Sequence, residues 1–151
     1  MDRQLVVIHE RRGSWAAQLR GRLHHRPVRW RETRGTEGLL DALGGSPCPI
    51  LVLDVGPRAA EGLDRLVRAS ARAPSALILA LDPEDRPEVR HLARPAGASM
   101  LWSGFAPPPD VAALVDRWID VARLRASRAG RAALPGYEPD PSDDPLALLG
   151  P

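Results

Sequence analysis

The sequence predicts a doubly wound α/β domain: a five-stranded parallel sheet with helices on both faces and the strand order 2-1-3-4-5. Five apolar runs of strand length alternate with segments of helical period, as expected for successive strand-helix units. The runs at 49–54 and 75–82 are apolar on both faces, which places them in the middle of a covered sheet. Because strand-helix-strand crossovers are right-handed, such units wind their helices onto both faces.

The first two units form the N-terminal part of the domain. The apolar run 4–9 predicts the first strand, and a helix at 14–25 follows it, with Ser14 as the N-cap. The second strand, at 27–30, is short and carries charge, and Thr36 is expected to cap the helix that follows it. These features favour an edge position for the second strand.

The last three units follow the same alternation. We expect strands at 49–54, 75–82 and 99–102, and helices at 59–73, 87–97 and 111–129. The apolar face of the helix at 59–73 is predicted to comprise Leu63, Leu66, Val67 and Ala71. Pro87 suits the first turn of the next helix, where a missing backbone N–H group has no consequence.

Length and composition indicate one domain at 1–127 and a flexible acidic tail at 128–151. The chain has 151 residues, of which 44% are hydrophobic and 26% charged, as in ordinary globular domains. Its last part is rich in Pro, Gly and Asp and has no period. No apolar run approaches the roughly 20 residues that cross a bilayer, and the single cysteine, Cys48, suits a reducing compartment. We therefore expect a cytoplasmic protein with no membrane association.

The predicted topology gathers polar residues at one edge of the sheet. In this strand order the winding reverses between the first and third strands, and ligands of such sheets bind outside the carboxyl ends there. The candidate pocket comprises His9, Glu10 and Asp54, with Asp82 and Ser103 as neighbours. Asp54 is either a working chemical group or the polar end of a buried strand, satisfied by loop amides or by His9.

The order of these units, with an aspartate ending the third strand, resembles the receiver domains of two-component response regulators. Receivers place a glycine and an aliphatic residue eight and nine positions after the phosphoacceptor aspartate, and Gly62 and Leu63 stand there relative to Asp54. Pro57 lies one position earlier than the usual proline, and the run GAS at 97–99 is also receiver-like. The resemblance covers all five units and implies a three-layer sandwich of the flavodoxin and CheY type in a bacterial signalling protein.

The surroundings of Asp54 depart from the pattern of that family. Receivers end the first strand with two acids that hold Mg²⁺, whereas His9 and Glu10 stand here. A Ser or Thr ends the fourth strand of receivers, and Asp82 in its place would repel a phosphoryl group. A lysine ends the fifth strand, but Ser103 or its neighbour stands there and the chain has no lysine. Phosphoryl transfer depends on positioning and charge stabilisation, so the resemblance implies a degenerate receiver, or pseudo-receiver, that works without phosphorylation.

Two alternatives concern chemistry at the same edge. Asp54 could still accept a phosphoryl group, and Mg²⁺ is expected only in that case. His9, Glu10, Asp54 and Asp82 could also offer ligands to a divalent metal, but their spacing matches no tight metal motif. The sequence has no glycine-rich phosphate loop and no nucleophile elbow, so we expect no enzymatic activity, no cofactor and no metal.

A protein partner is the interaction that the resemblance implies. In receivers the face built from the fourth helix, the fifth strand and the fifth helix contacts partners. The corresponding residues here are Arg90, His91, Trp102, Phe105, Arg117 and Asp120. The sequence therefore predicts a non-enzymatic interaction module in signalling or regulation.

An arginine-rich segment near the N-terminus supports a further alternative, nucleic-acid binding. All 21 basic residues are arginine, and the segment contains Arg11, Arg12, Arg20, Arg22, Arg29 and Arg31. Such a patch could hold backbone phosphates, and the acidic tail could fold back to shield it. The net charge of the chain is only +2, however, and arginine on an edge strand also guards against aggregation.

Overall fold

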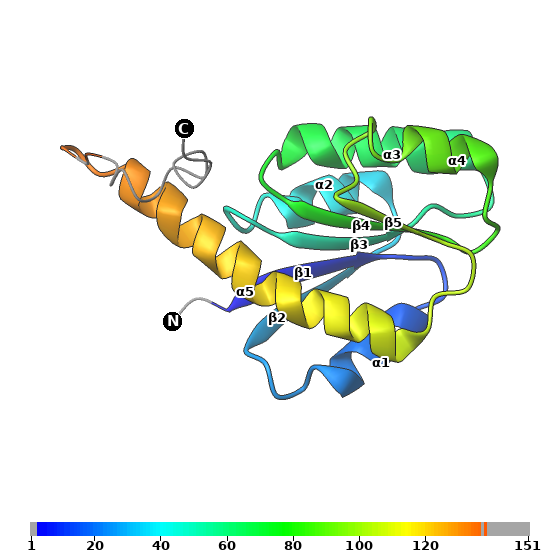
Figure 1. Cartoon of the computed structure of the whole chain (residues 1–151), viewed down its shortest axis with the longest axis horizontal. Coiled ribbons are helices and arrows are strands. Elements are labelled where there is room, and N and C mark those ends of the chain that lie inside the picture. Colours follow the sequence, from blue (N-terminus) through cyan, green and yellow to red (C-terminus); the bar gives the residue numbers. More distant parts are fainter. Residues whose placement is uncertain (1–2, 137, 139–151) are drawn as a thin grey trace, which may run out of the picture.

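The computed structural model describes residues 3–136 and 138 and confirms the predicted fold class (Figure 1). The strands in this range are β1 (Gln4–His9), β2 (Val28–Thr33), β3 (Ile50–Asp54), β4 (Leu77–Asp82) and β5 (Met100–Ser103). The helices are α1 (Ser14–Arg22), α2 (Thr36–Leu43), α3 (Ala59–Arg72), α4 (Pro87–Leu92) and α5 (Pro108–Ala132). The strands form one parallel sheet in the order β2-β1-β3-β4-β5.

The sheet separates two apolar cores. Helices α1 and α5 pack on one face, where Leu19 and Val115 meet inward residues of the strands. Helices α2, α3 and α4 cover the other face, where Leu39, Leu66 and Val89 are buried (Figure 1). All residues of β1 and β4 are buried, because both faces of these central strands are covered.

The bounds of several elements differ from the prediction; α1, for example, ends at Arg22 and not at residue 25. Strand β2 reaches Thr33 because it pairs with β1 along its whole length, and these ladder hydrogen bonds outweigh its charged sequence. Helix α4 ends at Leu92, earlier than expected. The predicted apolar face of α3 is partly wrong, since Val67 is 51% exposed and Ala71 is also exposed.

Close packing of α3 on β3 explains its different inward face. Gly62, Leu66 and Ala69 point to the sheet instead. A Cβ atom on Gly62 would lie 2.2 Å from the carbonyl oxygen of Val55, so only glycine fits at this approach. The receiver-like glycine is therefore required by packing, whatever the chemistry of Asp54.

The predicted N-caps at Ser14 and Thr36 are wrong. Both are the first residues of their helices, and Gly13 and Gly35 occupy the cap positions without a side chain to accept a hydrogen bond. Gly13 has a φ of 75°, a conformation that glycine adopts without strain. The group that does satisfy the first turn of α1 comes from the end of β1, as described below.

Helix α5 continues past residue 127, where the domain was expected to end. Residues 128–132 are alanine, arginine and a single glycine, and alanine and arginine are strong helix formers, so the helix persists to Ala132. The acidic and apolar stretch 139–151, and its predicted folding over the arginine segment, lie outside the described residues. None of the described helices is both long enough and apolar enough to cross a membrane.

Candidate functional site

The strand register brings the five predicted pocket residues to the carboxyl edge of the sheet. His9 pairs with Thr33 on one side and Leu53 on the other, so Asp54 follows directly beside it. Further along the same edge, Asp82 pairs with Ser103. The five residues thus lie along one edge, but only His9, Glu10 and Asp54 line a common pocket, and each side chain has its own bonding partner.

His9 is buried at the end of β1 and is held by the neighbouring edge strand. Its Nδ1 atom shares a hydrogen bond of 2.9 Å with the hydroxyl of Thr33. Burial, together with the nearby positive charge of Arg65, lowers the pKa of His9 to about 4. The imidazole is therefore neutral at pH 7 and forms no ion pair with Asp54.

Glu10 binds the N-terminus of α1. Its two carboxylate oxygens accept hydrogen bonds from the backbone N–H groups of Trp15, at 3.0 Å, and Ala16, at 2.9 Å. A carboxylate is favourable there because unpaired N–H groups and the helix dipole both present positive charge. The acid at the end of β1 thus has a structural partner for each oxygen.

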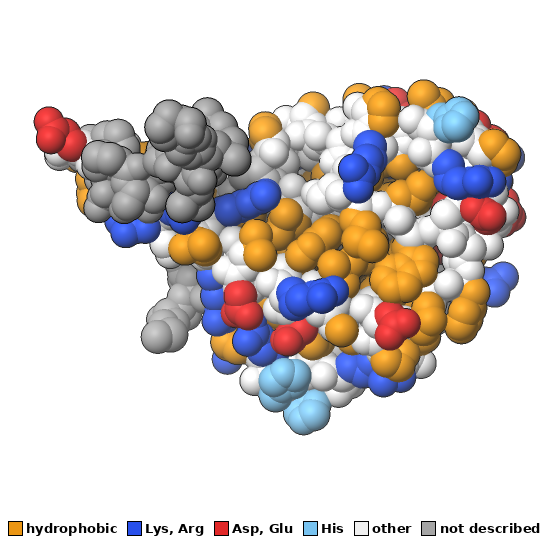
Figure 2. Space-filling view, in the orientation of Figure 1, with side chains coloured by type: hydrophobic (Ala, Val, Ile, Leu, Met, Phe, Trp, Pro, Cys, Tyr) orange, Lys and Arg blue, Asp and Glu red, His pale blue; other side chains and the backbone are white. Residues whose placement is uncertain are grey.

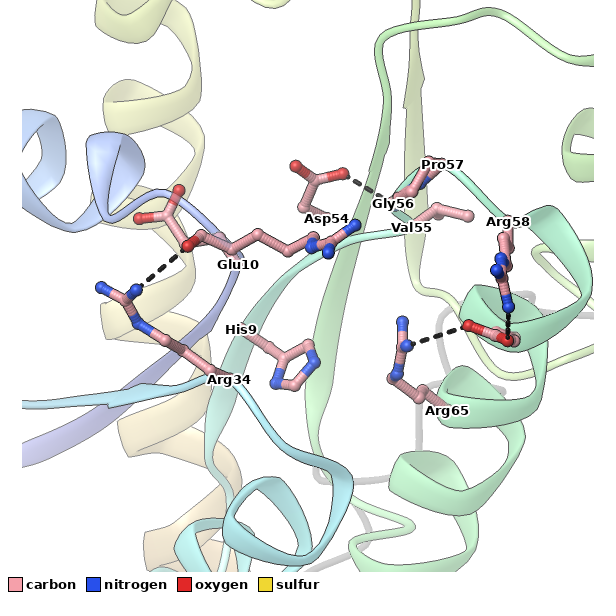
Figure 3. Close-up of a pocket in the computed structure, with 11 residues that line it drawn as sticks. His9, Glu10, Arg34, Asp54, Val55, Gly56, Pro57, Arg58 and Arg65 are labelled. Carbon is pink, nitrogen blue, oxygen red and sulfur yellow. Dashed lines mark hydrogen bonds and ion pairs between the residues drawn. The ribbon is translucent and has the colours of Figure 1, made fainter.

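Asp54 is half-buried and bonds only to its own loop among the described residues. Its Oδ1 atom accepts a hydrogen bond of 2.9 Å from the N–H group of Gly56, which has a φ of 81°. The interpretation in which loop amides satisfy this strand end agrees with the geometry, and His9 takes no part in it. The other carboxylate oxygen faces the pocket beside β1 (Figure 3).

Asp82 is 0% exposed and is neutralised by Arg86, a residue that the sequence analysis missed. Its Oδ1 atom accepts hydrogen bonds from Nε and Nη2 of Arg86, at 3.0 and 2.8 Å, and Oδ2 accepts one from the Arg86 backbone N–H group at 2.7 Å. Burial alone would lower the pKa of Arg86, but the hydrogen bond and charge of Asp82 raise it. The spacing of four residues between the strand-end acid and this arginine was the available signal.

Arg86 also ties two loops together. Its Nη2 atom donates a hydrogen bond of 2.7 Å to the carbonyl oxygen of Gly56, and its Nη1 atom donates one of 3.1 Å to that of Pro57. These carbonyls belong to the loop that follows Asp54. One guanidinium therefore joins the end of β4 to the β3–α3 loop.

Ser103 turns toward the β4–α4 connection instead of toward Asp54. Its hydroxyl donates a hydrogen bond to the carboxylate of Asp85. The same carboxylate pairs with Arg90 at 3.2 Å, and the backbone of Asp85 has a φ of 52°. The hydroxyl at the end of β5 is thus engaged on the side of the sheet edge away from β1.

The residues at the receiver metal positions do not fit a Mg²⁺ ion. Such an ion needs several oxygen ligands in near-octahedral geometry. Of the three positions that hold the ion in receivers, one is His9 and another is Glu10, both of whose oxygens bind α1. Only Asp54 offers an oxygen without a described partner. Across residues 3–136 and 138, no group of three or more His, Cys, Asp or Glu side chains could hold a metal.

The fold is similar to solved receiver domains. A CheY-like receiver domain protein from Methanospirillum hungatei gives a TM-score of 0.67 at 12% identity, over 82% of this chain and 99% of that chain. The receiver domain of a sensor histidine kinase from Pseudomonas aeruginosa, with magnesium in its active-site cleft, gives a TM-score of 0.62 at 13% identity, over 79% of this chain and 99% of that chain. A response regulator from Burkholderia pseudomallei with a phosphorylated aspartic acid gives a TM-score of 0.61 at 17% identity, over 76% of this chain and 71% of that chain. No protein-family model and no curated protein matches the sequence. At these low identities the likenesses to solved structures establish the fold alone.

The predicted partner face divides in the structure. Phe105 is 83% exposed, and Trp102 is half-buried against the core that α5 covers. Arg90, His91 and Arg117 are exposed. Asp120 instead forms an ion pair with Arg26, which follows α1, so its carboxylate is already engaged within the protein. Figure 2 shows apolar side chains gathered over β5 and the adjoining part of α5.

The arginine segment is split between both faces of the sheet. Trp30 on β2 packs into the core beneath α1, so its neighbours Arg29 and Arg31 point to the opposite face. Arg29 donates a hydrogen bond of 2.6 Å to the carbonyl oxygen of Gly45, after α2. Arg20 on α1 pairs with Glu32 on the other side at 3.0 Å. These arginines are thus divided between the two faces of the sheet, and nucleic-acid binding stays an untested prediction.

Proposed function

We propose that this chain is a receiver-like signalling module that binds a protein partner, has no enzymatic activity and does not depend on phosphorylation of Asp54. The contact between Arg86 and Asp82 carries this proposal. In the receiver pattern the end of the fourth strand offers a hydroxyl to phosphoryl oxygens. Here a buried carboxylate stands there, and the arginine that neutralises it also holds the loop after Asp54. The side chain of Asp82, which stands where receivers offer that hydroxyl, is therefore already bound to Arg86, and Arg86 also holds the loop after Asp54.

The surface around the β5–α5 connection supports binding of a protein. Phe105 is largely exposed, and Leu92 on α4 is also exposed. Beside Phe105 lies an apolar hollow of about 280 Å³, whose walls include Trp15, Leu81 and Pro83. An exposed aromatic next to an apolar hollow suits a partner that inserts an apolar side chain, as interface anchors do. The partner proposed here is a protein with such an anchor.

Phosphorylation at Asp54 is the second candidate, favoured by one observation. The Asp54 carboxylate borders a pocket of about 420 Å³. A phosphoryl group there would need a cation, a hydroxyl and a metal for charge stabilisation. Arginines of the pocket wall can supply the cation in place of a lysine, but the Ser103 hydroxyl is bound to Asp85, and Glu10 is bound to α1.

Site-specific photocrosslinking in cells tests the proposal. A photoreactive amino acid is placed at Phe105 in the native chain and in the Asp54→Asn variant, because Asp54 also lines the hollow and asparagine keeps the size of its side chain. Val67, an exposed apolar residue on α3, serves as the matched control position. We expect one discrete protein adduct from position 105, of equal yield in both backgrounds, and none from position 67. Loss of the adduct in Asp54→Asn would contradict independence from phosphorylation, and equal adducts at both positions would contradict the assigned face.

A further inference from the structure

A pocket lined by arginines opens between the carboxyl ends of β1 and β3, toward α2 and α3 (Figure 3). Its volume of about 420 Å³ lies within the range of small-molecule sites. The guanidinium groups that line it belong to Arg11, Arg34, Arg58 and Arg65. They come from three separate segments: the connection after β1, the connection after β2, and the N-terminal half of α3. The fold therefore assembles this set from distant parts of the sequence.

Two of the three carboxylates in the pocket wall are already engaged. Glu10 binds the N-terminus of α1, and Glu61 pairs with Arg58 at 3.0 Å and with Arg65 at 3.6 Å. Arg34 donates a hydrogen bond of 3.1 Å to the carbonyl oxygen of Arg11, and neither arginine forms an ion pair within residues 3–136 and 138. Four guanidinium groups thus stand against three carboxylates in the pocket wall, which leaves the wall with a net positive charge.

The third carboxylate and the histidine define where an anion would sit. The Asp54 carboxylate points away from the His9 ring, whereas Arg65 lies on the same side of the pocket as that ring (Figure 3). Nδ1 of His9 is bonded to Thr33, which leaves Nε2 as the ring nitrogen that can serve the pocket. A neutral imidazole with its proton on Nε2 can donate a hydrogen bond to an anion.

We propose that this pocket binds a small phosphorylated metabolite non-covalently, with its phosphate oxygens held by Arg65, Arg11 and His9 and with Arg34 at the rim. Guanidinium groups approaching from several walls suit a tetrahedral, doubly charged phosphate better than a planar carboxylate. This inference goes beyond the proposed function, because it requires neither a protein partner nor modification of Asp54.

Isothermal titration with inorganic pyrophosphate in the presence of EDTA tests the site. The native chain should bind one equivalent saturably and should bind citrate, a carboxylate probe, more weakly. Arg65→Gln should weaken pyrophosphate binding by roughly tenfold or more, since it removes a charge-assisted hydrogen bond. Arg68→Gln is the matched control, because Arg68 lies on the same helix, pairs with Asp64 at 3.1 Å and does not line the pocket. Its affinity should stay within about twofold of the native value.

Asp54→Asn separates this site from the phosphoacceptor position. The variant should bind pyrophosphate at least as tightly as the native chain, because a negative charge leaves the pocket wall. Loss of binding in Asp54→Asn, equal weakening by the two arginine variants, tighter binding of citrate, or no saturable binding to the folded native chain would each overturn the proposal. None of these results depends on a partner or a phosphoryl donor, so they leave the proposed function to its own test.

Discussion

Two aspartates at neighbouring strand ends have opposite environments. Asp82, at the end of β4, is fully buried, and both of its oxygens bind Arg86. Asp54, at the end of β3, is half-buried, uses one oxygen for a loop amide and borders an open pocket. A single arginine therefore closes one end of the site and leaves the other accessible. In this receiver-like fold the strand-end aspartate of β3 borders a pocket, whereas that of β4 is held by an internal ion pair.

Breaking the ion pair between Arg86 and Asp82 should produce the largest loss of stability. Arg86→Met leaves the Asp82 carboxylate buried without a partner, and the loss of one member of a buried pair costs about 3–5 kcal/mol of the free energy of unfolding. The side chain of Arg86 is only 14% exposed, so solvent provides little compensation. Urea unfolding followed by circular dichroism measures the change.

Arg90→Met provides the matched control for this contrast. Arg90 lies on α4, four residues after the N-cap residue Arg86, and pairs with Asp85, but its side chain is 52% exposed. Its removal should cost less than about 1 kcal/mol, as expected for a surface pair. Equal losses of unfolding free energy in Arg86→Met and Arg90→Met would show that the buried ion pair at the end of β4 contributes no more to stability than a surface ion pair.

The free energy of unfolding should depend on pH because of His9, which lies beside Asp54 at the accessible end of the site. Burial lowers the pKa of His9 from its ordinary value of 6.5 to about 4 in the folded protein, so the unfolded chain binds more protons between these values. Stability is therefore full above about pH 6.5 and falls as the pH drops toward 4, by up to about 3 kcal/mol.

Unfolding curves from pH 7 to pH 4 check this dependence. His9→Gln should lose less stability over this interval than the native chain. His24→Gln, which changes an exposed histidine bonded to the carbonyl oxygen of Gly21, should behave like the native chain. Parallel pH profiles for the native chain and His9→Gln would contradict the burial of a neutral imidazole.

The smallest effect concerns Glu10, which links the pocket to α1. Glu10→Ala should cost about 1–2 kcal/mol of the free energy of unfolding, because two N–H groups of α1 lose their acceptor. Glu37→Ala is the control, since Glu37 lies exposed in the first turn of α2 without capping the helix. Equal stability of the two variants, measured by urea unfolding, would mean that Glu10 is free for other roles.

The fold and the location of the site followed from periodicity, because buried parallel strands require continuous apolar runs. The end of β3 illustrates this, since the apolar run that stops at Asp54 fixed both the strand and its polar edge. The helix caps and the inward face of α3 could not be predicted in the same way. Capping by Glu10 depends on how β1 meets α1, and the burial of Gly62 depends on the distance between α3 and Val55.

The partners of the pocket residues were also beyond the sequence. Asp82 is a misfit for phosphoryl binding by its residue type, but the only sequence signal for Arg86 is its spacing of four residues, which does not by itself show a contact. No sequence pattern identifies Arg65 either, because its approach to His9 depends on the packing of α3. Side-chain pairing across elements is set by tertiary contacts, which periodicity does not encode.

The most direct test of phosphorylation independence is the intact mass of the native chain after incubation with Mg²⁺ and acetyl phosphate, with Asp54→Ala alongside. The committed bonds of Glu10, Asp82 and Ser103 predict that neither protein gains a phosphoryl group while both remain folded. A phosphoryl adduct on the native chain that is absent from Asp54→Ala would contradict the account and make Asp54 a working switch.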